Sequence, residues 1–351
     1  MTGRWKRKIV LIVVSFCLLL GSGACAGTND PGAHRLSEPA VYGNLAIYFV
    51  HGVSRGGPVP LTLQEALDRK VILVAEIGQV NELLVRNTGD EEVFIQSGDI
   101  VKGGQQDRVL SVGLLLPPHS GVVHIASFCV ESGRWSARGS EDVLSFSSAN
   151  ANLPARMAKL EIAGAVALKP DSTMAPSGSR QAEIWKSVEQ IQDKLSRNLG
   201  APVAAPQSRT SLELALENDR LAREQAEYIA ALQPKGEQGD DIVGYVFAVN
   251  GAVNSADIYP SNGLFKKMWP KLLRASVTEA ISEREAASAP APSVDSVNEF
   301  IASAERSELA DTKTKARTVI GVRENARVIL LESRPTAAAA DAWVHRSYIA
   351  K

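Results

Sequence analysis

The chain has 351 residues, and its 38 Lys and Arg side chains nearly balance 39 Asp and Glu. That length is ample for a large hydrophobic core. Nucleic acid is not an expected partner, because binding its phosphates calls for a basic face that a charge balance of this kind does not suggest.

The first residues predict export. A basic stretch at 4–8 precedes an apolar run of 12 residues, Ile9 to Leu20, whereas a membrane-spanning helix needs roughly 20. Small residues follow, with Ala24 and Ala26 as an A-x-A processing site, so residues 1–26 are interpreted as a cleaved signal peptide. The alternatives are an uncleaved membrane anchor and a lipid on Cys25.

Cleavage after residue 26 removes four basic residues and no acidic ones, which leaves 34 Lys and Arg against 39 Asp and Glu, a net charge of −5. It also removes Cys17 and Cys25, so Cys129 has no partner for an internal disulfide. Stability is then expected to come from packing. The expected location is the periplasm or the cell exterior, with lipid anchoring at Cys25 as the alternative.

Short apolar segments follow a polar tether at 27–41. A helix is predicted to begin at Thr62, since Glu65 stands three residues later in capping-box register. Strands are predicted around it, at 45–50, 71–77, 83–86, 93–95, 108–116 and 122–129. Such short strands, separated by turns, indicate an α+β fold with an antiparallel β-sandwich or half-barrel.

The second half is richer in helical patterns. Helices at 181–199 and 211–232 predict a helical hairpin. Asn250-Gly251 predicts a tight β-hairpin turn between two strands, and a further helix from 262 past 280 is expected to be interrupted or kinked at Pro270. The predicted main domain spans 42–285. A linker at 286–293 and a small C-terminal appendage at 294–351 complete the expected organisation, the appendage holding a helix at 294–310 and strands at 317–322 and 327–332.

The most unusual segment runs from Gly98 to Leu110. Gly103 and Gly104 would let a ligand approach the main chain, and amide, carboxylate and guanidinium groups follow at once. These groups suit a polar or anionic ligand, to which the forked guanidinium of Arg108 would donate hydrogen bonds. The alternative is a glycine-rich bulge braced by its own charges. The segment is neither a P-loop nor a dinucleotide fingerprint.

A second polar segment, Cys129 to Trp135, ends a predicted strand and contains Glu131 and Arg134. If strands 108–116 and 122–129 form a hairpin, both segments lie at one end of the sheet. The predicted ligand-binding residues are therefore Gly103, Gly104, Gln106, Asp107, Arg108, Glu131 and Arg134.

Other chemistry is less well supported by the pattern. Cys129 lacks an obvious histidine base and is interpreted as a small buried side chain. Asp99 or Asp107 with Glu131 could act as an acid–base pair, and Asp257 is interpreted as a turn or helix-entry residue. No metal-ligand spacing is present and no cofactor is expected.

Several segments together resemble the ADP-ribosylglycohydrolase- and rhodanese-phosphatase-associated protein domain family over about residues 42–280. They are Gly98-Asp99, Gly103 to Arg108, Cys129 to Trp135, Leu61 to Leu67, Glu76 with Val80 to Leu83, and the Asn250-Gly251 to Asp257 hairpin with Phe265 and Trp269. The family often has a basic residue where Gln105 stands here. Its name comes from companions acting on ADP-ribose-like and phosphate-bearing compounds, which implies a sugar- or nucleotide-derived ligand by association.

Three functions remain open at this point. The favoured one is an exported binding or interaction module for a small polar ligand or an envelope protein, contacting a membrane only through its signal or a lipid. The alternatives are a hydrolase of sugar- or phosphate-linked substrates using Asp107 or Glu131, and a structural protein of the cell envelope. Exposed arginines in a pocket would favour binding. Two carboxylates about 5–9 Å apart across a cleft would favour hydrolysis. Buried ion pairs between these residues would favour the structural protein, in which they stabilise the sheet.

Overall fold

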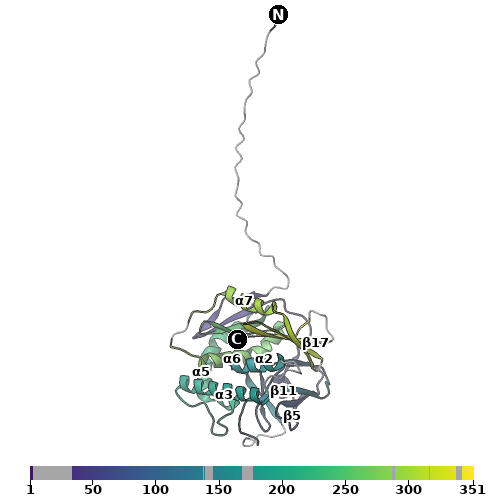
Figure 1. The fold of residues 1–351 in the computed structure, drawn as a ribbon, viewed down its shortest axis with the longest axis vertical. Helices are drawn as coiled ribbons and strands as arrows, with labels where there is room; N and C mark the ends of the chain where they lie inside the picture. Colours follow the sequence, from purple (N-terminus) through teal and green to yellow (C-terminus); the bar gives the residue numbers. More distant parts are fainter. Residues whose placement is uncertain are drawn as a thin grey trace. The chain divides into compact units, whose positions relative to one another are not determined.

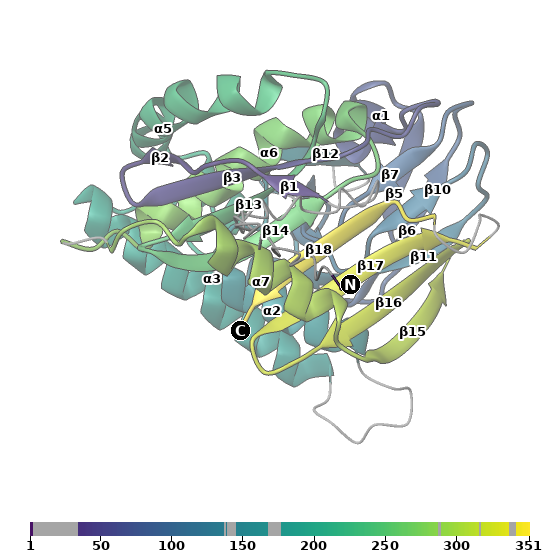
Figure 2. The same ribbon diagram turned by 90° about the horizontal axis from the view of Figure 1, so that it is seen from above.

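A nine-stranded antiparallel sheet dominates the computed structural model, which describes residues 1–2, 34–136, 138, 145–167, 177–286, 289–315, 317–336 and 342–351. Its strand order is β1-β3-β13-β14-β18-β17-β16-β15, with β2 pairing β3 at the side (Figure 2). The strands are β1 (Arg35–Leu36), β2 (Ala40–Tyr42), β3 (Leu45–His51), β13 (Ile242–Val249), β14 (Ala252–Ile258), β15 (Leu309–Lys315), β16 (Thr318–Glu324), β17 (Val328–Pro335) and β18 (His345–Ala350).

Two smaller sheets hold the glycine-rich segment. One has the order β10-β7-β4, with β4 parallel to β7, and the other has the order β12-β8-β9-β11-β6-β5. Their strands are β4 (Leu61–Thr62), β5 (Ile72–Glu76), β6 (Glu82–Asn87), β7 (Val93–Ile95), β8 (Asp99–Gly103), β9 (Arg108–Leu110), β10 (Leu114–Leu116), β11 (Val123–Cys129) and β12 (Phe146–Asn152). The predicted α+β class, with mostly antiparallel strands and a curled half-barrel sheet, is confirmed.

Local sequence signals explain several boundaries. Asn250 and Gly251 both have positive φ, 51° and 80°, and join β13 to β14 in the predicted hairpin. Thr62 and Glu65 form the predicted capping box at the start of α1 (Leu63–Asp68).

Several helices differ from the predictions, and the one at 156–167 was not predicted. The helices other than α1 are α2 (Arg156–Ala167), α3 (Ser177–Leu199), α4 (Leu212–Leu216), α5 (Asp219–Glu237), α6 (Asn262–Ser282) and α7 (Val294–Glu305). The predicted helix at 211–232 is divided into α4 and α5, because Asn218 caps a new start by accepting bonds from two backbone amides. Helix α6 continues through Pro270 without interruption.

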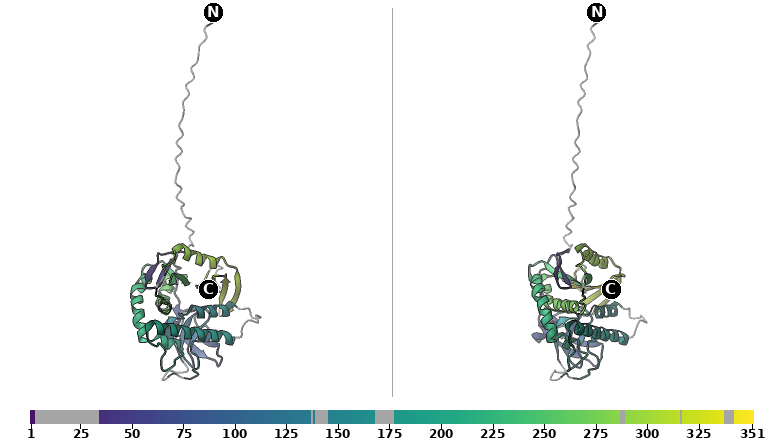
Figure 3. Two further views of the ribbon diagram at one scale, coloured as in Figure 1. Left: turned by 60° about the vertical axis from the view of Figure 1, so that its left-hand side comes forward. Right: turned by 90° about the vertical axis from the view of Figure 1, so that its left-hand side faces the viewer.

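Helices cover both faces of the large sheet. Alternate side chains of β3 and β13 face opposite ways, so Phe49 and Tyr245 pack with Trp269 of α6, while Tyr48 and Val246 belong to the cluster that includes α7. Figures 1 and 3 show α3, α5 and α6 below the sheet and α7 above it. None of the described helices is both long and apolar enough to cross a membrane.

The ends of the chain differ from the predicted organisation. The expected signal at 1–26, including Cys25, lies outside the described residues apart from Met1 and Thr2. The described part of the expected tether already pairs with β3 through β1 and β2.

The expected C-terminal appendage is likewise part of the main body, because β18 lies between β14 and β17 in the large sheet. Residues 34–351 therefore form one compact unit. The predicted helix at 294–310 ends at Glu305, and β15 follows it.

Candidate functional site

The two polar segments lie at one end of the six-stranded sheet because β9 and β11 are antiparallel neighbours. Cys129 stands opposite Arg108 in this pairing, so the residues before β9 and after β11 meet. The predicted single strand at 108–116 is wrong in detail, since β10 pairs with β7 in another sheet. The predicted juxtaposition of Asp107 with Glu131 is nevertheless present, and the backbone amide of Asp107 donates to Glu131 Oε2 at 3.3 Å.

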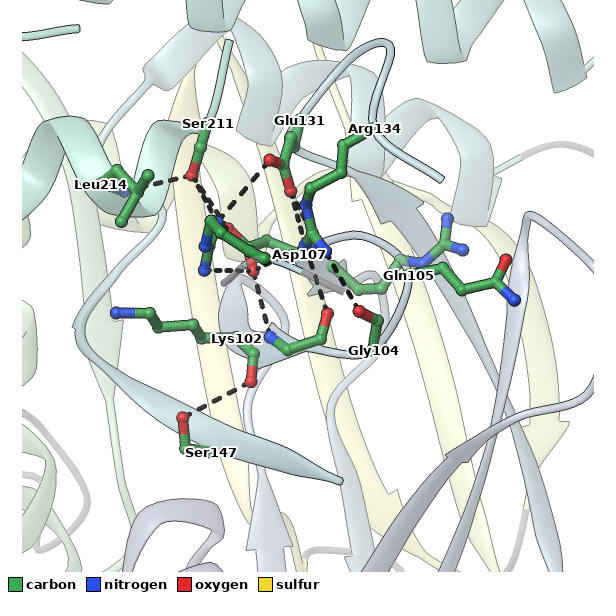
Figure 4. A network of polar contacts seen from close by, with 12 residues as sticks. Lys102, Gly104, Gln105, Asp107, Glu131, Arg134, Ser147, Ser211 and Leu214 are labelled. Carbon is green, nitrogen blue, oxygen red and sulfur yellow. Dashed lines mark hydrogen bonds and ion pairs between the residues drawn. The ribbon is translucent and has the colours of Figure 1, made fainter. Parts of the chain in front are cut away.

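Asp107, Glu131, Arg134 and Arg138 form a buried ion cluster (Figure 4). Arg138 is 2.8 Å from Asp107 Oδ2 and 3.6 Å from Glu131 Oε1. Arg134 is 2.7 Å from Glu131 Oε2 and 3.6 Å from Asp107 Oδ1. Both carboxylate side chains have an exposed fraction of 0%, so two anions are compensated by two cations inside the protein.

A backbone amide and one hydroxyl group also donate hydrogen bonds to the Asp107 carboxylate. The Gly103 amide donates to Asp107 Oδ1 at 3.1 Å, and the Ser211 hydroxyl donates to Oδ2 at 2.9 Å. Ser211 is also the N-cap of α4, because its hydroxyl accepts the Leu214 amide. The bond to Asp107 therefore connects α4 to the glycine loop.

The two adjacent glycines, Gly103 and Gly104, allow the start of β12 to pack closely against the backbone of this loop. Gly103 and Gly104 have φ of 130° and 56°. A Cβ on Gly103 would lie 2.5 Å from the Ser145 carbonyl oxygen, and one on Gly104 would lie 2.5 Å from the Phe146 ring. The start of β12 thus fills the space that the sequence analysis assigned to a ligand.

Arg108 points away from the ion cluster, as expected for consecutive residues entering a strand. It donates to the Val80 carbonyl oxygen at 2.8 Å, contacts the Cys129 sulfur, and lies 3.4 Å from Glu76 Oε1. Only 2% of it is exposed, so little of this guanidinium is available to an anion.

Cys129 is a structural residue in this arrangement. Gln181 of α3 receives a bond from the Cys129 amide at 2.9 Å and donates to its carbonyl at 2.8 Å. Burial raises the pKa of the thiol to about 11, outweighing the opposite effect of Arg108. Thiolate is the nucleophilic form, so the thiol is unreactive near neutral pH.

Gln106 is fully buried, and neither polar atom of its side-chain amide has a hydrogen-bond partner among the described residues. It presents no surface to a ligand. Of the seven predicted binding residues, Gln106, Asp107, Glu131 and Arg134 are therefore enclosed by protein, and both glycines are pressed against β12.

An open cavity of about 260 Å³ lies beside the ion cluster, and we name it the Trp135 cavity. Its lining residues are Ala75, Glu76, Gly78, Gln79, Val80, Gln105, Arg108 and Trp135. Trp135 is 52% exposed. Glu76 Oε1 accepts the Gln105 amide at 3.2 Å, which holds the loop of Gln105 against the end of β5.

Arg134 connects two walls of this cavity, the segments that contain Gln105 and Trp135. It donates to the Gly104 carbonyl oxygen at 3.1 Å, beside Gln105, while its own chain leads into Trp135. The enclosed ion cluster thus fixes the spacing between the two walls. Arg138 and Gln79 were not singled out from the sequence, and Glu76 was named only within the family resemblance. The short spacing of Arg138 from Arg134 is a signal for the second cation.

The other carboxylates that were considered lie elsewhere. Asp99 pairs with Lys271 at 2.9 Å, and Asp257 pairs with His345 at 2.9 Å. Asp257 is a strand residue of β14, and its interpretation as a turn or helix-entry residue is wrong. Within the described ranges no group of three His, Cys, Asp or Glu residues is arranged to hold a metal ion.

These features define a mixed α+β domain whose buried ion cluster supports an open, tryptophan-lined cavity. The chain belongs to the ARG and Rhodanese-Phosphatase-superfamily-associated Protein domain family, whose model matches residues 33–349. The match extends well beyond the resemblance over 42–280 and includes β15 to β18. No curated protein and no solved structure matches the chain.

Proposed function

We propose that this protein is an exported binding module whose ligand site is the Trp135 cavity. The observation that carries the proposal is a tryptophan residue, Trp135, that is 52% exposed on the wall of a cavity of about 260 Å³. Large aromatic side chains are usually buried, and an exposed one beside polar groups is typical of a recognition surface.

The lining favours a polar ring compound that is neutral or weakly charged. Glu76 and Arg108 offset each other's charge at 3.4 Å, and the side-chain amides of Gln79 and Gln105 both donate and accept hydrogen bonds. A sugar, or the sugar part of a nucleotide-derived compound, offers hydroxyls for the amides and a ring face for Trp135. Because Arg108 is almost enclosed, the ring contact replaces the anion contact as the main source of affinity.

Rigidity of the walls supports the same proposal. A site held in its binding geometry before the ligand arrives loses less entropy on binding. Arg134 holds the Gly104 carbonyl at 3.1 Å and Glu131 at 2.7 Å, so the two walls are fixed by contacts that the ligand does not have to supply.

The proposed location is the periplasm or the cell exterior, from the predicted signal at 1–26, with a lipid on Cys25 as the alternative. No step of catalysis is proposed, because Asp107 and Glu131, the pair considered for hydrolysis, have no exposed surface. The structural alternative has a specific observation in its favour, the mutual burial of the ion cluster. The following experiment separates that alternative from binding.

The test is a thermal-shift and tryptophan-fluorescence screen against monosaccharides, disaccharides, nucleotides and nucleotide sugars. A ligand at 100 times its dissociation constant stabilises the protein by about 2.7 kcal/mol. Trp135→Ala is expected to abolish the shift. The control Trp343→Ala removes a tryptophan that packs against Arg346, away from the cavity, and is expected to preserve it. Absence of any shift in the parent, or an equal shift in Trp135→Ala, would refute the proposal. The structural alternative, in which the ion cluster only stabilises the fold, would then remain.

A further inference from the structure

A second cavity, of about 370 Å³, lies where α2 and the β13–β14 turn meet α3 and the C-terminal end of α6. It shares no lining residue with the Trp135 cavity. Its size falls within the range of small-molecule sites, about 300–1,000 Å³.

Glu279 of α6 provides a buried acceptor at this cavity. Its Oε1 accepts the Arg156 amide at 2.9 Å and the Asn254 side-chain amide at 3.0 Å. Its Oε2 is buried and has no hydrogen-bond partner among the described residues, and the residue is only 4% exposed. Burial raises the pKa of this carboxyl and outweighs the opposite effects of Lys159 and Arg156.

Arg156 provides an uncommitted cation at the same cavity. Its backbone amide bonds Glu279, but among the described residues its guanidinium takes part in no hydrogen bond or ion pair. Its charge is nevertheless close enough to act on Glu279, because it favours the ionised form of that carboxyl. Lys194 and Glu283, also on the lining, already pair with each other at 2.6 Å.

The two helix ends reinforce this separation of charge. Arg156 is the first residue of α2, where the helix dipole favours an anion, and Glu279 lies in the last turn of α6, where the dipole favours a cation. Apolar side chains cover another part of the lining, among them Met157, Ile191 and Val253. The cavity therefore combines one site for a negative group, one site for a positive group and an apolar wall.

We propose that this cavity binds a free α-amino acid with an apolar side chain. The ligand's carboxylate bonds the Arg156 guanidinium and its ammonium bonds the Glu279 carboxylate, while its side chain packs against Ile191 and Val253. An α-amino acid fits because it carries both charges on one carbon, as the neighbouring Arg156 and Glu279 require. Simple amines and simple carboxylates each satisfy only one of the two groups.

The test is isothermal titration of the purified protein with L-leucine, 3-methylbutylamine and 4-methylpentanoate. The two analogues keep the leucine side chain and lack, respectively, its carboxylate and its ammonium group. Losing one charged hydrogen bond is expected to weaken binding by about 10-fold or more. Leucine is therefore expected to bind at least 10-fold more tightly than either analogue.

Two variants assign the contacts. Glu279→Gln retains an oxygen that can accept the Arg156 amide, so the start of α2 is preserved while the ammonium partner is lost. Arg156→Gln changes a side chain without partners and is not expected to affect folding. Each is expected to weaken leucine binding about 10-fold or more, and Glu189→Gln, on the exposed face of α3, is expected to leave it unchanged.

The analogues make the assignment specific. Arg156→Gln should not alter binding of the amine, and Glu279→Gln should not alter binding of the carboxylate. The proposal is overturned if leucine gives no heat of binding at millimolar concentration, if the amine alone binds as well as leucine, or if both variants bind leucine like the parent.

Discussion

Glu213 offers a direct measurement of the electrostatics around the ion cluster. It lies in the first turn of α4, two residues after Ser211, and is 2% exposed. Its Oε2 has no hydrogen-bond partner among the described residues. Burial, together with the charges of Glu217 and Asp107, raises the pKa of this carboxyl to about 8. Glu213→Gln removes the titration and keeps the shape.

The sign of the effect follows from proton linkage. The unfolded chain releases the Glu213 proton near pH 4.5, whereas the native chain retains it until about pH 8. Between these values the native state binds more protons, so the free energy of unfolding falls as the pH rises. The difference of 8 − 4.5 = 3.5 pKa units, at about 1.36 kcal/mol each, gives a loss of about 5 kcal/mol at most.

The assay is urea unfolding of the parent and Glu213→Gln at pH 5, 6, 7 and 8. The variant is expected to gain stability relative to the parent at each step, reaching a difference of about 3–5 kcal/mol at pH 8. Comparing the two proteins cancels other titrating groups, such as Glu65 and Glu332, whose pKa values are lowered by their partners. A difference that stays constant over this range would refute the reasoning.

Three further predictions concern the site. Arg138→Ala removes the closest cation from Asp107, at 2.8 Å, and is expected to cost about 3–5 kcal/mol in urea unfolding; a cost below 1 kcal/mol would show that the ion cluster does not brace the fold. Gly104→Ala combines a φ of 56° with a contact 2.5 Å from the Phe146 ring, and is expected to lower the melting temperature, with about 1–3 kcal/mol lost from strain alone; an unchanged melting temperature would contradict this account. Cys129 is expected to react with iodoacetamide at pH 7.5 only when the protein is unfolded, because its pKa is raised to about 11; rapid alkylation of the native protein, followed by mass spectrometry, would show otherwise.

Local chemistry made part of this structure predictable. The Asn250-Gly251 turn and the Thr62 capping box each depend on a few adjacent residues, and both are present. The meeting of Asp107 with Glu131 required one further step, an antiparallel pairing across a short connection, and that pairing also exists between β9 and β11.

The remaining fold depends on contacts between distant residues. Strand β18 lies between β14 and β17, and its pairing with β14 joins segments almost a hundred residues apart without a local turn to signal it. Strand β15 is an edge strand with polar residues on both faces, so it lacks the apolar alternation that identifies a half-buried strand. These two strands are why the C-terminal segment was mistaken for an appendage.

The candidate site divides for a simple geometric reason. Asp107 and Arg108 are consecutive and their side chains point to opposite sides, so one enters the ion cluster and the other lines the Trp135 cavity. A sequence places both residues in one motif and does not show which side is filled by protein. The side chains that fill the space around Asp107 are those of Arg138 and Ser211, which belong to other segments of the chain.

This division determines which substitutions can report on binding. A variant within the ion cluster leaves a buried charge without its partner and also releases the walls that Arg134 connects, so stability and binding should fail together. A variant of Trp135 changes a half-exposed ring that belongs to no buried cluster, so only binding should fail. Loss of ligand response in Trp135→Ala at an unchanged melting temperature would therefore establish recognition in the cavity, whereas loss in an Arg134 variant would not.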